Sequence, residues 1–95
     1  MQRAKALANL RDYQSQLETM GVKELYLFGS VARDEAKPSS DVDVLVELAH
    51  PMGFDFFALK PTLESFLGCN VDVGTPDSLK PALRERLMQE AIRVF

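Results

Sequence analysis

The sequence has one cysteine and no long apolar run, and both features restrict the class of protein. Cys69 cannot form an intrachain disulfide, which fits a reducing cytoplasm. No segment approaches the roughly 18 consecutive apolar residues that a membrane span requires. The N-terminal stretch with Gln2, Arg3 and Lys5 lacks the apolar core of a signal peptide. We therefore expect a cytoplasmic protein with no membrane partner.

An excess of positive charge is also missing. The formal net charge is −3, so the chain gains little from releasing the counterions of nucleic acid, and direct binding of duplex nucleic acid is not expected. Basic residues do gather late in the chain, but Glu85 and Glu90 interleave with them. That pattern is typical of a solvated helix face, formed here with Lys80, Arg84, Arg86 and Arg93.

The hydrophobic pattern predicts one small α/β domain over residues 1–95. Apolar spacings of three and four residues predict helices over residues 2–20, 31–36, 54–67 and 76–90. Runs of aliphatic and aromatic residues predict strands over residues 23–28, 42–48 and 71–73, with a fourth over 92–95. We expect Pro61 to kink the third helix or to start a second one there. Thr75 and Pro76 are expected to begin the last helix, which Pro81 divides. The result is a mixed sheet of three to four strands flanked by helices.

Two aspartates begin the clearest strand. Asp41 and Asp43 are separated by one residue, so both side chains lie on one face while Val42 and Val44 lie on the other. Their Cα atoms are expected about 6.5 Å apart, which allows both carboxylates to approach one metal cluster. Hard carboxylate oxygens favour Mg²⁺ or Mn²⁺. The alternative is structural: Asp41 caps the loop and Asp43 faces solvent.

Gly29 and Ser30 follow the first predicted strand directly. Glycine allows a sharp turn and a close approach to a ligand, and the free N–H groups at the next helix suit a phosphate group. The alternative is an ordinary strand-to-helix turn with Ser30 as the N-cap.

A third acid, Asp72, lies between two valines on the short strand. It either faces solvent or, if its strand is adjacent to that of Asp43, completes a trio of carboxylates. Such a trio could hold two metal ions that activate an acceptor oxygen and stabilise a leaving pyrophosphate.

Gly29-Ser30, ten intervening residues and then Asp41-Val42-Asp43 resemble the signature of the DNA polymerase beta-type nucleotidyltransferase superfamily. The chain is most similar to the minimal nucleotidyltransferases that act as antitoxins beside HEPN-domain toxins. The matching segments are residues 27–33 (Leu-Phe-Gly-Ser-Val-Ala-Arg), 40–47 (Ser-Asp-Val-Asp-Val-Leu-Val-Glu), 71–76 (Val-Asp-Val-Gly-Thr-Pro) and 83–87 (Leu-Arg-Glu-Arg-Leu).

The resemblance implies a role for each matching residue. Gly29 and Ser30 would hold the triphosphate of ATP, Asp41 and Asp43 would bind two Mg²⁺ ions, and Asp72 would join the ion that activates the nucleophile. Arg33 either contacts a phosphate or forms a surface ion pair. By the same resemblance, the enzyme would transfer AMP to a tyrosine of a partner HEPN toxin and so silence it. The alternative is an antitoxin that neutralises its partner by masking alone.

A domain this small leaves no segment for gripping an acceptor, so we expect either a small acceptor or a protein that docks, and a second copy of the chain is possible as a partner. Phe54 and Phe57 lie off the main apolar stripe of residues 54–67, and they either seal the core or form a contact patch. His50 is interpreted as a loop residue and Cys69 as a small apolar filler.

Overall fold

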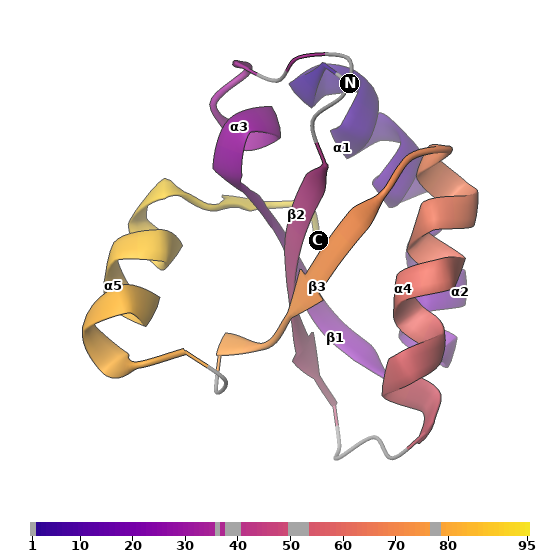
Figure 1. The fold of residues 1–95 in the computed structure, drawn as a ribbon. Coiled ribbons are helices and arrows are strands. Elements are labelled where there is room, and N and C mark those ends of the chain that lie inside the picture. The colour runs from indigo at the N-terminus through magenta and orange to yellow at the C-terminus, as the bar shows by residue number, and fades with distance from the viewer. Residues whose placement is uncertain (1, 36, 38–40, 50–53, 77–78) are drawn as a thin grey trace.

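The computed structural model describes residues 2–35, 37, 41–49, 54–76 and 79–95, and its strands form one four-stranded mixed sheet (Figure 1). The predicted α/β fold is confirmed. In chain order, the elements are α1 (Arg3–Asp12), α2 (Gln14–Thr19), β1 (Val22–Phe28), α3 (Gly29–Ala32), β2 (Val42–Leu48), α4 (Phe54–Leu67), β3 (Val71–Gly74), α5 (Pro81–Glu90) and β4 (Ile92–Arg93).

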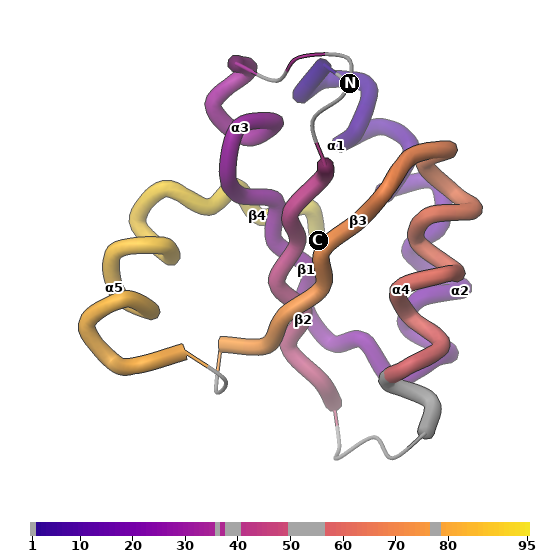
Figure 2. Tube along the Cα trace, in the orientation of Figure 1, coloured from indigo at the N-terminus to yellow at the C-terminus, as the bar shows by residue number. Residues whose placement is uncertain are grey.

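The strand order is β3-β2-β1-β4, so the two strands that carry the predicted carboxylates are neighbours. β1 pairs with β2 and with β4 in the antiparallel sense, whereas β2 and β3 run parallel and are connected by α4. Figure 2 shows the chain ending beside β1, after β4. The parallel pair brings the N-terminal ends of β2 and β3 to the same edge of the sheet.

The two faces of the sheet have different surroundings. One face packs against α1, α2 and α4, and its valines at 42, 44 and 46 are fully buried with Leu10, Leu59 and Leu63. The opposite face carries Asp43, Leu45 and Glu47 of β2, because successive strand residues alternate sides. Figure 1 shows α5 on this second side, away from α1, α2 and α4. We call this second surface the site face.

The predicted helix over residues 2–20 is instead two helices, interrupted at Tyr13. Tyr13 has φ −102° and ψ 12°, which interrupts the regular helical geometry. Its ring stacks on Phe66 of α4, with 3.7 Å between ring centroids and 2° between ring planes. The N-terminal helix thus divides at a residue that packs against a distant helix, and the local spacing of apolar residues does not contain that information.

The prolines differ in part from the prediction. Pro61 starts no second helix and lies inside one continuous α4, where burial of Leu59, Leu63 and Leu67 outweighs the backbone hydrogen bond that a proline cannot donate. Thr75 and Pro76 do not begin the last helix. That helix begins at Pro81, after Lys80 in an extended conformation (φ −62°, ψ 144°), as expected for a residue before proline.

The two phenylalanines expected off the apolar stripe have different outcomes. Phe57 is 74% exposed, so it does not seal the core. The side chain of Phe54, and all of His50, lie outside the described residues. Among the described residues, every helix is too short or too polar to span a membrane.

Candidate active site

Gly29 and Asp43 are in close contact, although they come from different elements. Gly29 follows β1 with φ +74°, a left-handed conformation that favours glycine. A Cβ atom at this position would collide with Asp43 Oδ2 and would lie 3.3 Å from Asp43 Cγ. The antiparallel register places Phe28 opposite Asp43, which brings the next residue, Gly29, against the carboxylate. The two motifs predicted from the sequence therefore meet in space.

Asp72 lies directly beside Asp43. The parallel register of β2 and β3 pairs the two aspartates, so their side chains project from the same face of adjacent strands. Asp43 is half-buried, whereas Asp72 is exposed at the edge strand. Asp72 was expected to join the other carboxylates if its strand lay next to that of Asp43. The two strands are neighbours, so this condition is met.

The pKa of Asp43 reflects this crowding. Partial burial raises the pKa of the Asp43 carboxyl group above its ordinary value, and the charge of Asp72 and a hydrogen bond with it raise it further. Asp41 adds to the rise, and Arg33 opposes it. The charged form of Asp43 is thus less favourable here than it would be in water.

Asp41 is exposed immediately before β2 and acts on Asp43 through its charge. In the part of the chain that the structure describes, however, no three acidic, histidine or cysteine side chains are grouped closely enough to hold a metal ion. The structure therefore pairs two of the three predicted acids and leaves the third nearby.

Ser30 lies in α3, a single helical turn whose first residue is Gly29, so Ser30 is not the N-cap. A helix this short has a weak dipole, and the value of this turn for a phosphate group lies in its backbone N–H groups and the Ser30 hydroxyl. Contacts with α1 fix the turn: Arg3 Nη1 donates to the Ala32 carbonyl at 3.3 Å, and the Arg3 backbone N–H donates to Asp34 Oδ1 at 3.1 Å.

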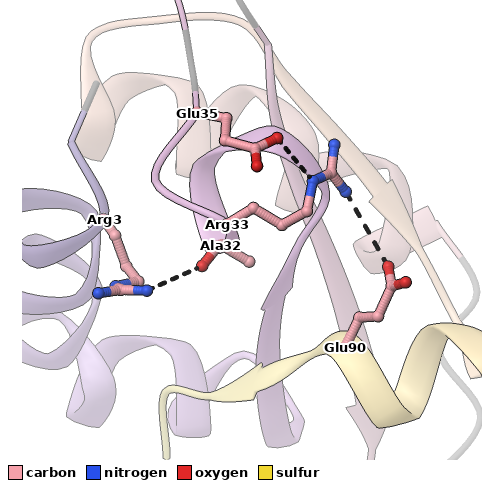
Figure 3. Close-up of polar contacts among 5 residues, drawn as sticks. All are labelled: Arg3, Ala32, Arg33, Glu35 and Glu90. Atoms are coloured by element: carbon pink, nitrogen blue, oxygen red, sulfur yellow. Dashed lines mark hydrogen bonds and ion pairs between the residues drawn. The ribbon is translucent and has the colours of Figure 1, made fainter.

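Two roles were predicted for Arg33, a phosphate contact or a surface ion pair, and the structure contains surface ion pairs. Its Nε lies 3.2 Å from Glu35 Oε2, and its Nη1 lies 4.0 Å from Glu90 Oε2 at the end of α5 (Figure 3). All three side chains are about half exposed or more, so these pairs contribute little to stability. The guanidinium nevertheless stays close enough to Asp43 to act on its carboxyl group.

Sequence reasoning missed a second polar cluster on the site face. The Tyr26 hydroxyl donates to Glu24 Oε2 at 2.6 Å, and Arg93 Nη2 lies 3.4 Å from Glu24 Oε1. The hydrogen bond from Tyr26, and then one from Glu47, lower the pKa of Glu24, whereas the bond with Glu24 raises the pKa of Glu47. Strand alternation puts Glu24, Tyr26 and Phe28 on one face, but only the register shows that Glu47 is opposite Glu24.

The donor chemistry of the site fits a small divalent cation. Asp43 and Asp72 present hard oxygen atoms side by side, and their mutual repulsion is the kind that a cation removes. Mg²⁺ is usually bound through one or two carboxylates together with water and substrate phosphates, so a closed cage of three protein ligands is not required.

A family model described as a nucleotidyltransferase domain matches residues 7–94 of the chain. The chain belongs to this family. A protein adenylyltransferase, MntA, of Thermococcus cleftensis is 40% identical over 78 residues, which cover 81% of this chain and 79% of that one. A Methanocaldococcus jannaschii protein assigned as a protein adenylyltransferase is 45% identical over 76 residues, or 79% of this chain and 82% of its own.

Solved structures support the same assignment. One assigned to the minimal nucleotidyltransferases superposes with a TM-score of 0.85 at 36% identity, covering 97% of this chain and 95% of that one. A Shewanella oneidensis complex of an MNT antitoxin with a tri-AMPylated HEPN toxin gives a TM-score of 0.69 at 20% identity, covering 95% of this chain and 71% of that one. At that identity the likeness demonstrates a shared fold only. The resemblance to the minimal nucleotidyltransferases is therefore confirmed, and the chain is a nucleotidyltransferase.

Proposed function

We propose that this minimal nucleotidyltransferase is a Mg²⁺-dependent protein adenylyltransferase that transfers AMP from ATP to a tyrosine of a partner HEPN toxin and so acts as an antitoxin. The observation that carries the proposal is the contact of the Asp43 carboxylate with the backbone of Gly29, with Asp72 in register beside it. This arrangement joins a phosphate-binding turn to a pair of metal-binding carboxylates. The relatives named protein adenylyltransferases support the choice of AMP and of a protein acceptor.

Each residue has a distinct role in this proposal. Gly29 and Ser30 hold the triphosphate through backbone N–H groups and the hydroxyl, while Asp41 and Asp43 hold two Mg²⁺ ions and Asp72 contributes to one of them. Bound divalent ions would stabilise the charge on the phosphates and lower the pKa of the acceptor hydroxyl. Arg33 turns from Glu90 toward a phosphate oxygen, since a charge-assisted bond to phosphate is stronger than an exposed ion pair at 4.0 Å.

The position of Asp72 determines where the acceptor approaches. β3 is an edge strand and Asp72 is exposed on it, so a protein acceptor can reach this carboxylate from outside the sheet. The acceptor hydroxyl releases its proton to solvent and its oxygen forms a bond to the α-phosphorus, as the bond to pyrophosphate breaks on the opposite side, toward Gly29 and Ser30.

The test is incubation of the purified protein with Mg²⁺, labelled ATP and the product of the neighbouring reading frame, followed by intact mass measurement. A gain of one or more AMP units on that product is expected, and peptide mapping should place it on tyrosine. The Asp41→Asn/Asp43→Asn variant should transfer nothing while remaining folded by circular dichroism. Full transfer by this variant would rule out the proposed roles of the two acids.

Neutralisation by masking alone is the second candidate, and one observation favours it: Phe57 is 74% exposed on α4, which suits a contact with a partner that needs no catalysis. The two candidates differ in the behaviour of the same double variant. If the variant still protects cells against the partner toxin as well as wild type does, masking is sufficient. If protection is lost while the complex still forms, catalysis is required.

A further inference from the structure

The edge strand β3 carries Asp72, and the residue before Asp72 directs its backbone groups away from the sheet. Among the described strands, β3 pairs with β2 alone, and the Val42 N–H donates to the Asn70 carbonyl at 3.0 Å. Successive residues of a strand direct their backbone groups to alternate sides, so the next residue, Val71, directs its N–H and carbonyl outward. Such groups on an edge strand are open to water or to another chain unless side chains cover them.

Both outward groups of Val71 are bound by side chains of α4. Lys60 Nζ donates to the Val71 carbonyl at 2.6 Å, and the Val71 N–H donates to Glu64 Oε2 at 3.2 Å. Lys60 and Glu64 are about one helical turn apart, and Lys60 Nζ lies 3.7 Å from Glu64 Oε2. The two side chains and the Val71 backbone therefore form a closed ring of contacts, which we call the edge clamp.

The edge clamp is anchored in the core. Lys60 and Glu64 directly follow Leu59 and Leu63, which are fully buried, and Figures 1 and 2 both show α4 beside β3. The Glu64 side chain is only 27% exposed, so its bond with the Val71 N–H is partly shielded from water. Hydrogen bonds to charged groups are stronger than neutral ones. The edge clamp thus joins the edge strand to a helix whose position is set by close packing.

Asp72 needs this support because its carboxylate lies beside a second one. Asp72 directly follows Val71, and the parallel register pairs it with Asp43. The two carboxylates repel, and this repulsion acts to separate the edge strand from β2. Val71 resists the separation in two ways, through its fully buried side chain and through its clamped backbone.

We propose that Lys60 and Glu64 are positioning residues that hold the Val71 backbone, and through it keep the Asp72 carboxylate beside Asp43 for the divalent ion. This proposal rests on the proposed function, in which both carboxylates bind Mg²⁺. It gives a role to two charged residues that lie outside the sequence motifs of the site. Both act through Val71 and Asp72, and neither contacts the ion.

The test measures the dissociation constant of Mn²⁺, used in place of Mg²⁺, by electron paramagnetic resonance on the protein without nucleotide. Lys60→Met removes the ammonium group and keeps an unbranched side chain. It is expected to weaken Mn²⁺ binding by about tenfold, the low end of the effect of groups that orient metal ligands. The sign is informative, because removal of a positive charge without loss of positioning would strengthen the binding of a cation. Lys60→Arg can still donate to the Val71 carbonyl and should bind Mn²⁺ within about twofold of wild type.

Lys5→Met is the matched control, since Lys5 is an exposed lysine on α1 and takes no part in the edge clamp. It should not weaken Mn²⁺ binding. A double-mutant cycle then tests whether the edge clamp acts through Asp72. Lys60→Met added to Asp72→Asn should weaken Mn²⁺ binding by less than about twofold more than Asp72→Asn alone.

Glu64→Leu removes the acceptor of the Val71 N–H and provides a second variant if thermal unfolding shows that Lys60→Met is not folded. It should weaken Mn²⁺ binding in the wild-type background by about tenfold, as Lys60→Met does. In the Asp72→Asn background it should weaken Mn²⁺ binding by less than about twofold.

Several results would contradict the positioning role. Unchanged or stronger Mn²⁺ binding by Lys60→Met would overturn it and leave the metal site in place. Equal weakening in the wild-type and Asp72→Asn backgrounds would show that the edge clamp stabilises the fold without acting through this carboxylate. Absence of Mn²⁺ binding by wild type would exclude the positioning role even if AMP is transferred. The expected Mn²⁺ results in a protein that transfers no AMP would instead support the positioning role and refute the proposed function.

Discussion

Replacing Asp43 with asparagine is expected to make the ligand-free protein more stable. Asp43 is half-buried against Gly29 and beside Asp72, and these surroundings raise the pKa of its carboxyl group. A raised pKa in the folded state means that ionisation is less favourable there than in the unfolded chain. Stability from this group is therefore lost as the pH rises from the ordinary aspartate range through the raised pKa. Asparagine keeps the shape of the side chain and removes the charge.

The magnitude follows from the register of the two strands. Adjacent strands are about 4.8 Å apart, and two unit charges at that separation repel by about 1–2 kcal/mol at effective dielectric constants of about 40–80, which suit a pair at the surface. For a domain of this size, 1 kcal/mol corresponds to a shift of roughly 4–8 °C in the melting temperature. We therefore expect Asp43→Asn to melt several degrees above wild type at neutral pH without metal.

The assay is urea unfolding of both proteins in EDTA from acidic to neutral pH. The gain in the free energy of unfolding should grow as the pH rises from the ordinary aspartate range through the raised pKa, because the wild-type carboxylate then becomes charged. Millimolar Mg²⁺ should narrow the gap by stabilising wild type alone. Glu18→Gln, which removes one negative charge from an exposed helix position, should change little. A variant less stable than wild type at every pH would refute the reasoning.

Three further predictions concern the turn, the core and the second polar cluster. Gly29→Ala should lower the free energy of unfolding by more than Gly68→Ala does, as measured by urea unfolding. Both positions have positive φ, which costs alanine about 1–3 kcal/mol of strain, but only Gly29 faces the Asp43 carboxylate. Equal costs for the two variants would contradict the close contact. Leu63→Ala should lower the free energy of unfolding by about 2–5 kcal/mol in the same assay, since Leu63 is fully buried between α4 and the sheet. Tyr26→Phe should raise the pKa of Glu24 toward its ordinary value in an NMR titration, because the hydroxyl is its main stabilising donor.

The sequence was sufficient for features set by local patterns. Alternation of apolar residues identified β2 with its correct bounds, and the Gly-Ser and Asp-x-Asp spacing identified the elements that form the site. Features set by distant contacts could not be predicted from the sequence. The first helix divides at Tyr13, which stacks on Phe66 of a distant helix, and α5 begins at Pro81 although Pro76 also fits the local pattern of a helix start.

The same limit applies to the site. The pattern placed Asp41 and Asp43 on one face. Asp72 comes 29 residues after Asp43 in the sequence, and only the pairing of β2 with β3 shows that it is the closer partner of Asp43. Arg33 likewise had two possible roles, a phosphate contact or a surface ion pair, because its partner Glu90 comes from the far end of the chain. Strand order and helix placement, which depend on the whole fold, supply the partner in each case.

Packing on one face of the sheet determines the chemistry on the other. Val42 and Val44 are fully buried and pair with Val71 and Val73, and a slip of β3 by one residue would turn Val71 and Val73 toward the site face and Asp72 into the core. Burying a carboxylate without a partner is far more costly than its repulsion with Asp43 at the surface. The valines therefore fix the register that keeps Asp43 beside Asp72, and the repulsion that remains at the surface is the part that a bound cation can relieve.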